Sequence, residues 1–211
     1  MFEFMQNNAG AFLQAMGEHM LLCGIALLCG ILICVVFCIT TYPFPKAQEK
    51  IIHVFGFFRL IPGIALLVIF LPVFGVGTFP AVFSLTVITI PTILINLLSG
   101  VRNVPTEIRF SADSLGLSPW NVFFRIEIPM AVPFLLLGIR TALVDLIAIA
   151  TIATLMGSGG LGRFVLTGLS INNMPMALAG TFLLTVLALL SEFLLSRLQN
   201  WYSIHYLGVT K

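Results

Sequence analysis

The amino-acid sequence predicts an all-α, polytopic membrane protein with about five transmembrane helices. Of its 211 residues, 59% are hydrophobic and only 9% are charged, whereas a typical soluble domain has about 25% charged residues. The mean hydropathy is +1.12. A soluble chain of this size buries only about 70% of its surface on folding, so this much apolar surface requires a bilayer to cover it.

Five apolar runs are long enough to cross a bilayer, which takes a helix of about 20 residues. The predicted spans cover approximately residues 20–42, 51–71, 79–98, 131–156 and 176–195. They form one transmembrane domain, residues 19–198, between an external segment, residues 1–18, and a cytoplasmic tail, residues 199–211. Pro62 and Pro91 fall inside two of the spans. Each predicts either a broken helix, as the binding sites of transporters use, or a simple kink.

The basic residues predict the orientation, because Lys and Arg favour the cytoplasmic side of short loops. Five spans place the two termini on opposite sides. With the N-terminus outside and the C-terminus in the cytoplasm, the cytoplasmic side holds seven basic residues outside the spans, and the other side holds only Arg163. The seven are Lys46, Lys50, Arg102, Arg109, Arg125, Arg197 and Lys211.

A polar stretch, residues 100–129, separates the third and fourth spans. It holds six of the eighteen charged residues, namely Arg102, Glu107, Arg109, Asp113, Arg125 and Glu127. Charged residues between two spans must lie in water or against another protein, because hydrocarbon rejects them. We therefore expect a soluble partner to contact the protein here.

Turn and capping residues predict the shape of this polar stretch. A helix starts near Pro105 and ends at Gly116, and a second helix starts near Ser118 and reaches Pro129. The two short helices form a cytoplasmic L-shaped pair. Apolar residues near its corner are Leu115, Leu117 and Trp120. Exposed apolar groups of this kind mark a protein–protein contact.

Two charged residues lie inside the fourth span. Arg140 and Asp145 each cost about 2.5–3.5 kcal/mol at the centre of a membrane helix, and they lie about 140° apart around it, too far to pair with each other. We expect Arg140 to reach the cytoplasmic surface and bond to helix ends. Asp145 lies deeper, and either faces a water-filled pathway, near a cationic substrate, or pairs with Arg59.

The glycine-rich stretch Gly157–Gly162 matches the pattern G-x-G-x-x-G. A nucleotide site is excluded, because no βαβ unit surrounds it and Arg163-Phe164 replaces the lysine and hydroxyl that phosphate and magnesium need. We expect a tight turn and a close helix contact at an outer gate instead. The full set of pathway or gate candidates is Arg59, Pro62, Asn96, Arg140, Asp145, Gly157, Gly159, Gly160 and Gly162.

The sequence contains no set of nucleophile, histidine and acid on one side of the membrane, and no metal-ligand cluster. We therefore expect no catalytic residue, no metal and no cofactor in this chain, and the net charge of +2 is too small to suggest nucleic acid. The four cysteines, Cys23, Cys29, Cys34 and Cys38, are read as small packing residues. His19, His53 and Glu192 are placed at membrane boundaries.

The polar stretch also resembles a known signature. Ser111-Ala112, then Gly116, then Ile126-Glu127-Ile128-Pro129 are similar to the E-A-A-x3-G-x9-I-x-L-P motif of type I permease subunits of binding-protein-dependent ABC importers. Further similarities to the osmoprotectant permeases, which serve glycine betaine, choline and carnitine, are Gly17-Glu18-His19, Gly138-Ile139-Arg140-Thr141, Ala150-Thr151 and the glycine-rich stretch. The resemblance departs at Phe110, which occupies the place of the motif's glutamate, and Glu107 and Asp113 are the nearest acids.

The resemblance implies a transport subunit in the plasma (inner) membrane of a prokaryote, surrounded by lipid. A separate ATPase subunit would hold ATP and Mg²⁺ and bind the polar stretch. A second permease copy or homologous permease would complete the pathway. An extracellular or periplasmic binding protein would deliver the substrate. The implied ATPase-coupling residues are Phe110, Ser111, Ala112, Asp113, Ser114, Leu115, Gly116, Leu117 and Pro129. The alternatives are an importer of methionine or ergothioneine, a stand-alone channel or ion-coupled transporter, and a lipid-acting enzyme.

Overall fold

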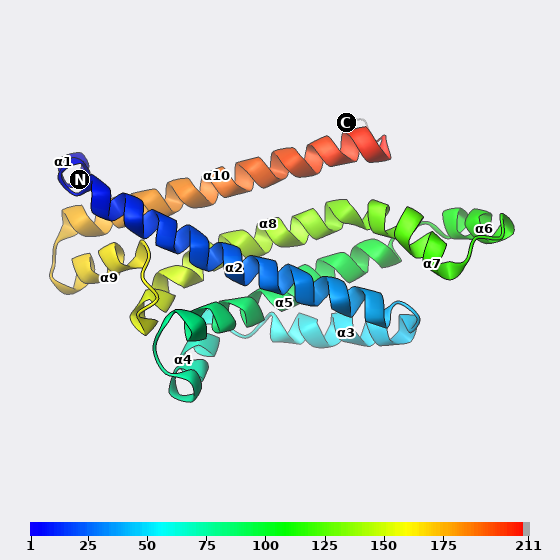
Figure 1. Cartoon of the computed structure of the whole chain (residues 1–211), viewed down its shortest axis with the longest axis horizontal. Coiled ribbons are helices and arrows are strands. Elements are labelled where there is room, and N and C mark those ends of the chain that lie inside the picture. The colour runs from blue at the N-terminus through cyan, green and yellow to red at the C-terminus, as the bar shows by residue number, and fades with distance from the viewer. Residues whose placement is uncertain (209–211) are drawn as a thin grey trace.

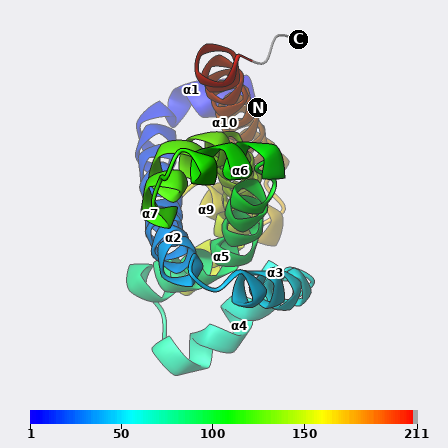
Figure 2. The same cartoon turned by 90° about the vertical axis from the view of Figure 1, so that its right-hand side faces the viewer.

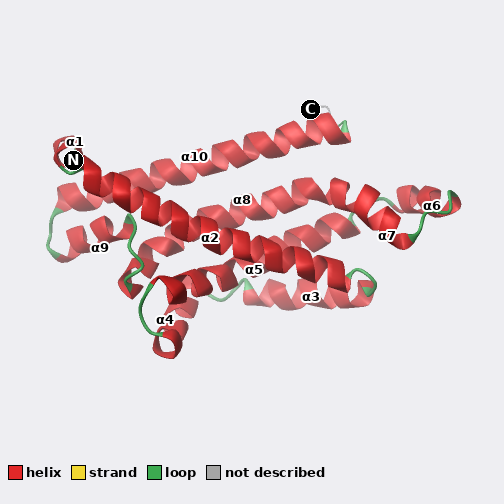
Figure 3. Ribbon diagram, in the orientation of Figure 1, coloured by secondary structure: helices red, strands yellow, loops and turns green. Residues whose placement is uncertain are grey.

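The computed structural model describes residues 1–208, and helices are the only regular elements among them (Figure 3). Four helical segments are long and apolar enough to cross a membrane: α2 (Ala9–Thr41), α5 (Thr78–Arg102), Pro119–Met156, and α10 (Met174–Leu207). They run lengthwise along the molecule (Figure 1). A fifth span is formed only if the bent pair α3 (Pro45–Phe58) and α4 (Gly63–Phe74) is taken together.

The second predicted span is broken at Pro62, so of the two alternatives for this proline the broken helix is confirmed and the simple kink is not. The α3 and α4 axes differ by 87° across the break, which lies between Phe58 and Gly63. Pro62 explains the break, because proline lacks the N–H that would continue the helix and restricts the residue before it. Pro91, in contrast, lies inside an uninterrupted α5. Viewed from the end that carries α6, α3 and α4 lie to one side of the other helices (Figure 2).

The helix that contains the first predicted span begins before that span. A short helix, α1 (Phe2–Asn7), is followed directly by α2, which starts at Ala9 rather than near Met20. The early turns of α2 are packed rather than free, because the Phe12 ring stacks on Phe164 with 4.0 Å between centroids. At the other end of the chain, α10 extends to Leu207, so most of the predicted tail continues the helix that contains the last predicted span.

The predicted L-shaped pair is half right. The first short helix is present as α6 (Thr106–Ser114). The second is not a separate helix, because α7 (Pro119–Val122) continues through a π-helical turn (Phe123–Glu127) into α8 (Ile128–Ala153). Ser118 caps the start of this long segment through its side-chain oxygen. Pro129, which cannot donate to the preceding turn, follows the π-helical turn that accommodates it.

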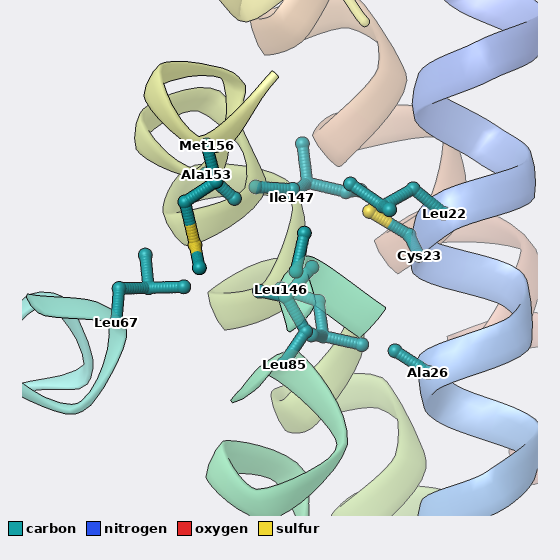
Figure 4. Close-up of a cluster of buried hydrophobic side chains, with 11 residues drawn as sticks. Leu22, Cys23, Ala26, Leu67, Leu85, Leu146, Ile147, Ala153 and Met156 are labelled. Carbon is teal, nitrogen blue, oxygen red and sulfur yellow. The ribbon is translucent and has the colours of Figure 1, made fainter. Parts of the chain in front are cut away.

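The core consists of small and branched apolar residues where α2, α5 and α8 pack together. One buried cluster includes Leu22, Cys23, Leu85 and Leu146, which converge from these three helices in Figure 4. Small residues let helices approach closely in a membrane. Gly138 illustrates this, because a Cβ there would lie 2.9 Å from that of Asn96. Cys23, Cys34 and Cys38 are buried, and all four cysteines are free.

Candidate functional site

Helix α6 lies at one end of the molecule, beyond the long helices (Figure 1). The C-terminal end of α10 lies toward the same end, whereas α1 and α9 (Gly162–Ser170) lie at the opposite one (Figure 1). Two large apolar side chains are exposed on α6 and its C-cap, Phe110 at 74% and Leu115 at 80%. The helix therefore presents exposed apolar surface at this end of the molecule.

The elbow after α6 has a defined backbone structure. Gly116 has φ +74°, and its N–H donates to the Asp113 carbonyl at 2.9 Å while the Leu117 N–H donates to the Ala112 carbonyl at 3.2 Å. These two bonds and the left-handed glycine form a Schellman motif, which satisfies the last carbonyls of the helix. The predicted role of Gly116 as a helix stop is therefore confirmed, and the position favours glycine because of its positive φ.

A shallow apolar groove runs beside this elbow. Its lining residues come from α6, from the elbow and from the π-helical turn: Glu107, Ile108, Ser111, Ala112, Leu115, Leu117 and Ile126. Of the predicted coupling residues 110–117, four line this groove, namely Ser111, Ala112, Leu115 and Leu117, whereas Asp113 lines a different pocket. Pro129 does not line the groove, because it lies in α8 and its carbonyl accepts a hydrogen bond from Tyr202 Oη at 3.2 Å.

An ion pair that the sequence analysis missed holds α6 against the rest of the protein. Arg109 Nε lies 2.8 Å from Glu127 Oε1, and the Glu127 side chain is only 3% exposed. Arg109 Nη2 also donates to the Val101 carbonyl at 2.8 Å. The pair links α6 to the π-helical turn. A brace is thus present although Phe110 replaces the motif's glutamate, and the basic residue beside Phe110 supplies it.

Tyr42, just beyond the end of α2, extends this braced region. Its hydroxyl donates to the Pro119 carbonyl at 3.0 Å, and its ring packs on Phe123 with 4.1 Å between centroids. Burial, together with the nearby Glu127 carboxylate, raises the pKa of Tyr42 to about 12. The hydroxyl therefore stays protonated and continues to donate at physiological pH.

Arg59, Pro62 and Asp145 come together at the break between α3 and α4. All three line one cavity of about 260 Å³, although Asp145 comes from α8. Asp145 is exposed, and within residues 1–208 it forms no ion pair with Arg59. Of the two expectations for Asp145, a closed pair with Arg59 is not formed among the described residues, and a position facing a water-filled pathway stays a prediction.

Arg140 has partners that the sequence analysis did not assign to it. Its Nε lies 3.0 Å from Glu192 Oε1, and its Nη1 donates to Gln199 Oε1 at 3.2 Å. Both partners are side chains of α10, so the expectation of bonds to helix ends is wrong. A membrane arginine is satisfied most fully by a carboxylate on a neighbouring helix, and Glu192 is that partner rather than a residue explained by interfacial placement alone.

Asn96 bonds within its own helix. Its Nδ2 donates to the Thr92 carbonyl at 2.7 Å, and it packs beside Gly138. The geometry explains Asn96 as a packing residue between α5 and α8. Its predicted place in the pathway stays a prediction.

The glycine-rich stretch forms the expected tight turn. Gly157, Gly159 and Gly160 have φ values of +75°, +76° and +95°, which only glycine adopts easily. Gly162 packs so closely on Thr151 and Thr154 that a Cβ would overlap them.

Two side chains of α2 hold this turn. The Gly160 N–H donates to Glu18 Oε2 at 2.9 Å, and a Cβ on Gly160 would lie 3.0 Å from His19 Nδ1. The His19 side chain is fully buried, and its Nε2 lies 3.2 Å from the Ile147 carbonyl; its placement at a membrane boundary stays a prediction. Two motifs 142 residues apart thus meet.

Across residues 1–208, no three His, Cys, Asp or Glu side chains gather closely enough to hold a metal ion. The candidate site is therefore made of two parts with different chemistry. One is the apolar elbow at the end of the molecule, and the other is the charged cavity at the broken span.

Comparisons with known proteins place the chain in a family. Residues 26–203 match the model for the binding-protein-dependent transport system inner membrane component. Over 196 residues the chain is 31% identical to the glycine betaine/carnitine/choline transport system permease protein of Bacillus subtilis, covering 93% of this chain and 90% of that protein. Over 196 residues it is 33% identical to the carnitine transport permease protein of Listeria monocytogenes, with the same two coverages.

A solved structure supports the same assignment at the level of the fold. The inward-facing MetNI methionine ABC transporter contains a chain that matches with a TM-score of 0.79 at 22% identity, covering 90% of this chain and 95% of that one. The protein therefore belongs to the family of binding-protein-dependent transport system inner membrane components, the permease subunits of ABC transporters.

Proposed function

We propose that this chain forms the translocation pathway of an ABC importer for a small quaternary amine such as glycine betaine, carnitine or choline. The observation that carries the proposal is the similarity, over more than nine-tenths of the chain, to two permeases whose names give these substrates. The chain contributes the pathway and no catalytic chemistry of its own.

The driving force comes, in this proposal, from a separate ATPase subunit that holds ATP and Mg²⁺. A second permease copy, or a homologous permease, completes the pathway, and an extracellular or periplasmic binding protein delivers the substrate. The family description, which names binding-protein-dependent transport, supports the last of these partners. Alternating access follows if closure of the ATPase shifts the balance between two arrangements of the spans.

The elbow after α6 is the proposed ATPase contact. Support comes from the exposed apolar side chains Phe110 and Leu115 and from the adjacent groove. The ion pair between Arg109 and Glu127 links α6 to the π-helical turn, so movement of α6 is transmitted through that turn to α8. The α6 end is then cytoplasmic, with the N-terminus outside and the C-terminus inside, in agreement with the distribution of basic residues.

The test is uptake by the reconstituted complex. The permease, its ATPase and its binding protein are placed in liposomes that contain ATP, and labelled glycine betaine, carnitine, choline, methionine and ergothioneine are supplied outside. We expect uptake of at least one quaternary amine that depends on both ATP and the binding protein. Uptake of methionine alone would contradict the proposed substrate class, and uptake without the ATPase would favour a stand-alone channel or ion-coupled transporter.

A further inference from the structure

The cavity at the broken span has a composition that differs from its surroundings. It lies where α3 ends and α4 begins, and it is closed on the inner side by α5 and α8. Its volume is about 260 Å³, below the range of about 300–1,000 Å³ usual for drug-sized ligands. Among its lining residues are Phe58, Arg59, Leu66 and Asp145. The size fits a solute with few atoms.

The two charges in this cavity lack ion-pair partners within residues 1–208. Three other arginines of the chain, Arg102, Arg109 and Arg140, are each paired with an acid. Ionisable residues at membrane depth are costly, and they are retained where they pair or line a pathway for a substrate. Arg59 and Asp145 share one cavity without closing on each other, which leaves a gap between opposite charges.

The backbone adds a second positive feature on the Arg59 side. Helix α4 has twelve residues and starts at Gly63, and no side chain caps its N-terminus. The first N–H groups of such a helix, together with its dipole, favour an anionic group. In membrane transporters, broken helices direct this end toward the anionic part of a substrate. Arg59 and the start of α4 therefore create a positive side of the cavity.

The lining of the cavity also contains two groups suited to a cation. Asp145 supplies a negative charge, and Phe58 supplies an aromatic ring. A quaternary ammonium group cannot donate hydrogen bonds, so a carboxylate and the face of an aromatic ring are the groups that recognise it best.

We infer that this cavity binds a zwitterion that carries both a carboxylate and a quaternary ammonium group. Arg59 and the N-terminus of α4 hold the carboxylate, and Asp145 and Phe58 hold the ammonium. The inference rests on the proposed function and adds to it, because it assigns the zwitterionic amines, glycine betaine and carnitine, rather than the simple cation choline, as the better ligands of the membrane pathway.

The experiment compares uptake of labelled glycine betaine and choline by the full complex of permease, ATPase and binding protein in ATP-loaded liposomes. Arg59→Gln should lower glycine betaine uptake by about tenfold or more, because a charge-assisted contact is lost, and should lower choline uptake far less. Asp145→Asn should lower the uptake of both by about tenfold or more. Leu66→Trp leaves both charges in place but fills the cavity, and should also lower both.

Arg197→Gln is the matched control, because Arg197 lies on α10, where its guanidinium stacks on Phe193, outside this cavity. It should leave uptake unchanged. Each variant must co-purify with the ATPase as the wild type does, and if a charge variant does not assemble, Leu66→Trp decides whether the cavity is used.

The possible outcomes separate the two proposals. A wild-type complex that imports no quaternary amine contradicts the proposed function. Wild-type uptake that persists in assembled Arg59→Gln and Asp145→Asn complexes overturns the inference alone. Equal losses of glycine betaine and choline uptake in Arg59→Gln overturn the assignment of the carboxylate to Arg59, and unchanged uptake in Leu66→Trp overturns the cavity as the binding site.

Discussion

Arg109 and Arg59 each lie in the same region as one acid, but the two sets are arranged in opposite ways. Arg109 and Glu127 are in contact at 2.8 Å, with the carboxylate almost fully buried. Arg59 and Asp145 line one cavity and, within the described part of the chain, are not paired. The first set is closed and structural, whereas the second is open and available to a ligand.

This difference indicates which charges the fold needs for stability and which it holds for another purpose. Breaking a buried ion pair leaves an uncompensated charge and is strongly destabilising. An unpaired charge makes no such contribution, so its removal costs the fold little. When each arginine is replaced by glutamine, the loss of stability should therefore be largest for the arginine with a buried acidic partner and smallest for the arginine without an ion-pair partner.

Arg109→Gln should have the largest effect on stability. It leaves Glu127 buried without a cation, which costs about 3–5 kcal/mol for a fully buried pair, and about 2–3 kcal/mol here because the Arg109 side chain is 37% exposed and partly screened. The measurement is the denaturant dependence of unfolding of the purified permease in lipid nanodiscs.

The double variant Arg109→Met with Glu127→Leu is the control for this first prediction. Replacing both charges by apolar side chains removes the buried, unpaired carboxylate, and such replacements are often neutral or stabilising. The double variant should therefore recover most of the loss. A double variant as unstable as Arg109→Gln would show that the ion pair is not what holds α6.

Arg140→Gln should have an intermediate effect. It removes the contact with Glu192 on α10 and alters the bond to Gln199, and polar contacts between membrane helices contribute about 1 kcal/mol on average. The same unfolding measurement should place this variant between wild type and Arg109→Gln. A loss as large as that of Arg109→Gln would reverse the expected order.

Arg59→Gln should have the smallest effect on stability, within about 0.5 kcal/mol of wild type, because Arg59 closes no ion pair in the described residues. This variant separates the two arginines most clearly, because Arg59→Gln should keep its stability while it loses transport of a zwitterion. A strongly destabilised Arg59→Gln protein would place Arg59 with Arg109 as a structural residue.

Hydrophobic runs could be read from the sequence because a membrane imposes a minimum length on every span. Four of the five predicted spans correspond to long helices. The break at Pro62 could not be separated from a kink, because Pro91 has the same local chemistry and lies in an unbroken helix. Whether a proline ends a helix depends on the packing around it, which local sequence does not contain.

The contacts that build the site were harder to predict than the residues that carry it. Glu18 and Gly160 both lie in motifs that the sequence analysis singled out, yet their hydrogen bond joins residues 142 positions apart. Arg109 and Glu127 were recognised only as charged residues, since their pairing depends on the angle between α6 and the π-helical turn.

The most direct test of the proposed ATPase contact is whether the ATPase covers the elbow after α6. Leu115→Cys places a thiol on the elbow, and Leu155→Cys places one on a side chain that is exposed to a similar degree, 70% against 80%, but far from α6 in the chain. A membrane-impermeant maleimide then labels each variant in nanodiscs with and without the ATPase subunit. We expect the ATPase to slow the labelling of Leu115→Cys and to leave that of Leu155→Cys unchanged. Equal labelling of Leu115→Cys with and without the ATPase would contradict the proposed contact.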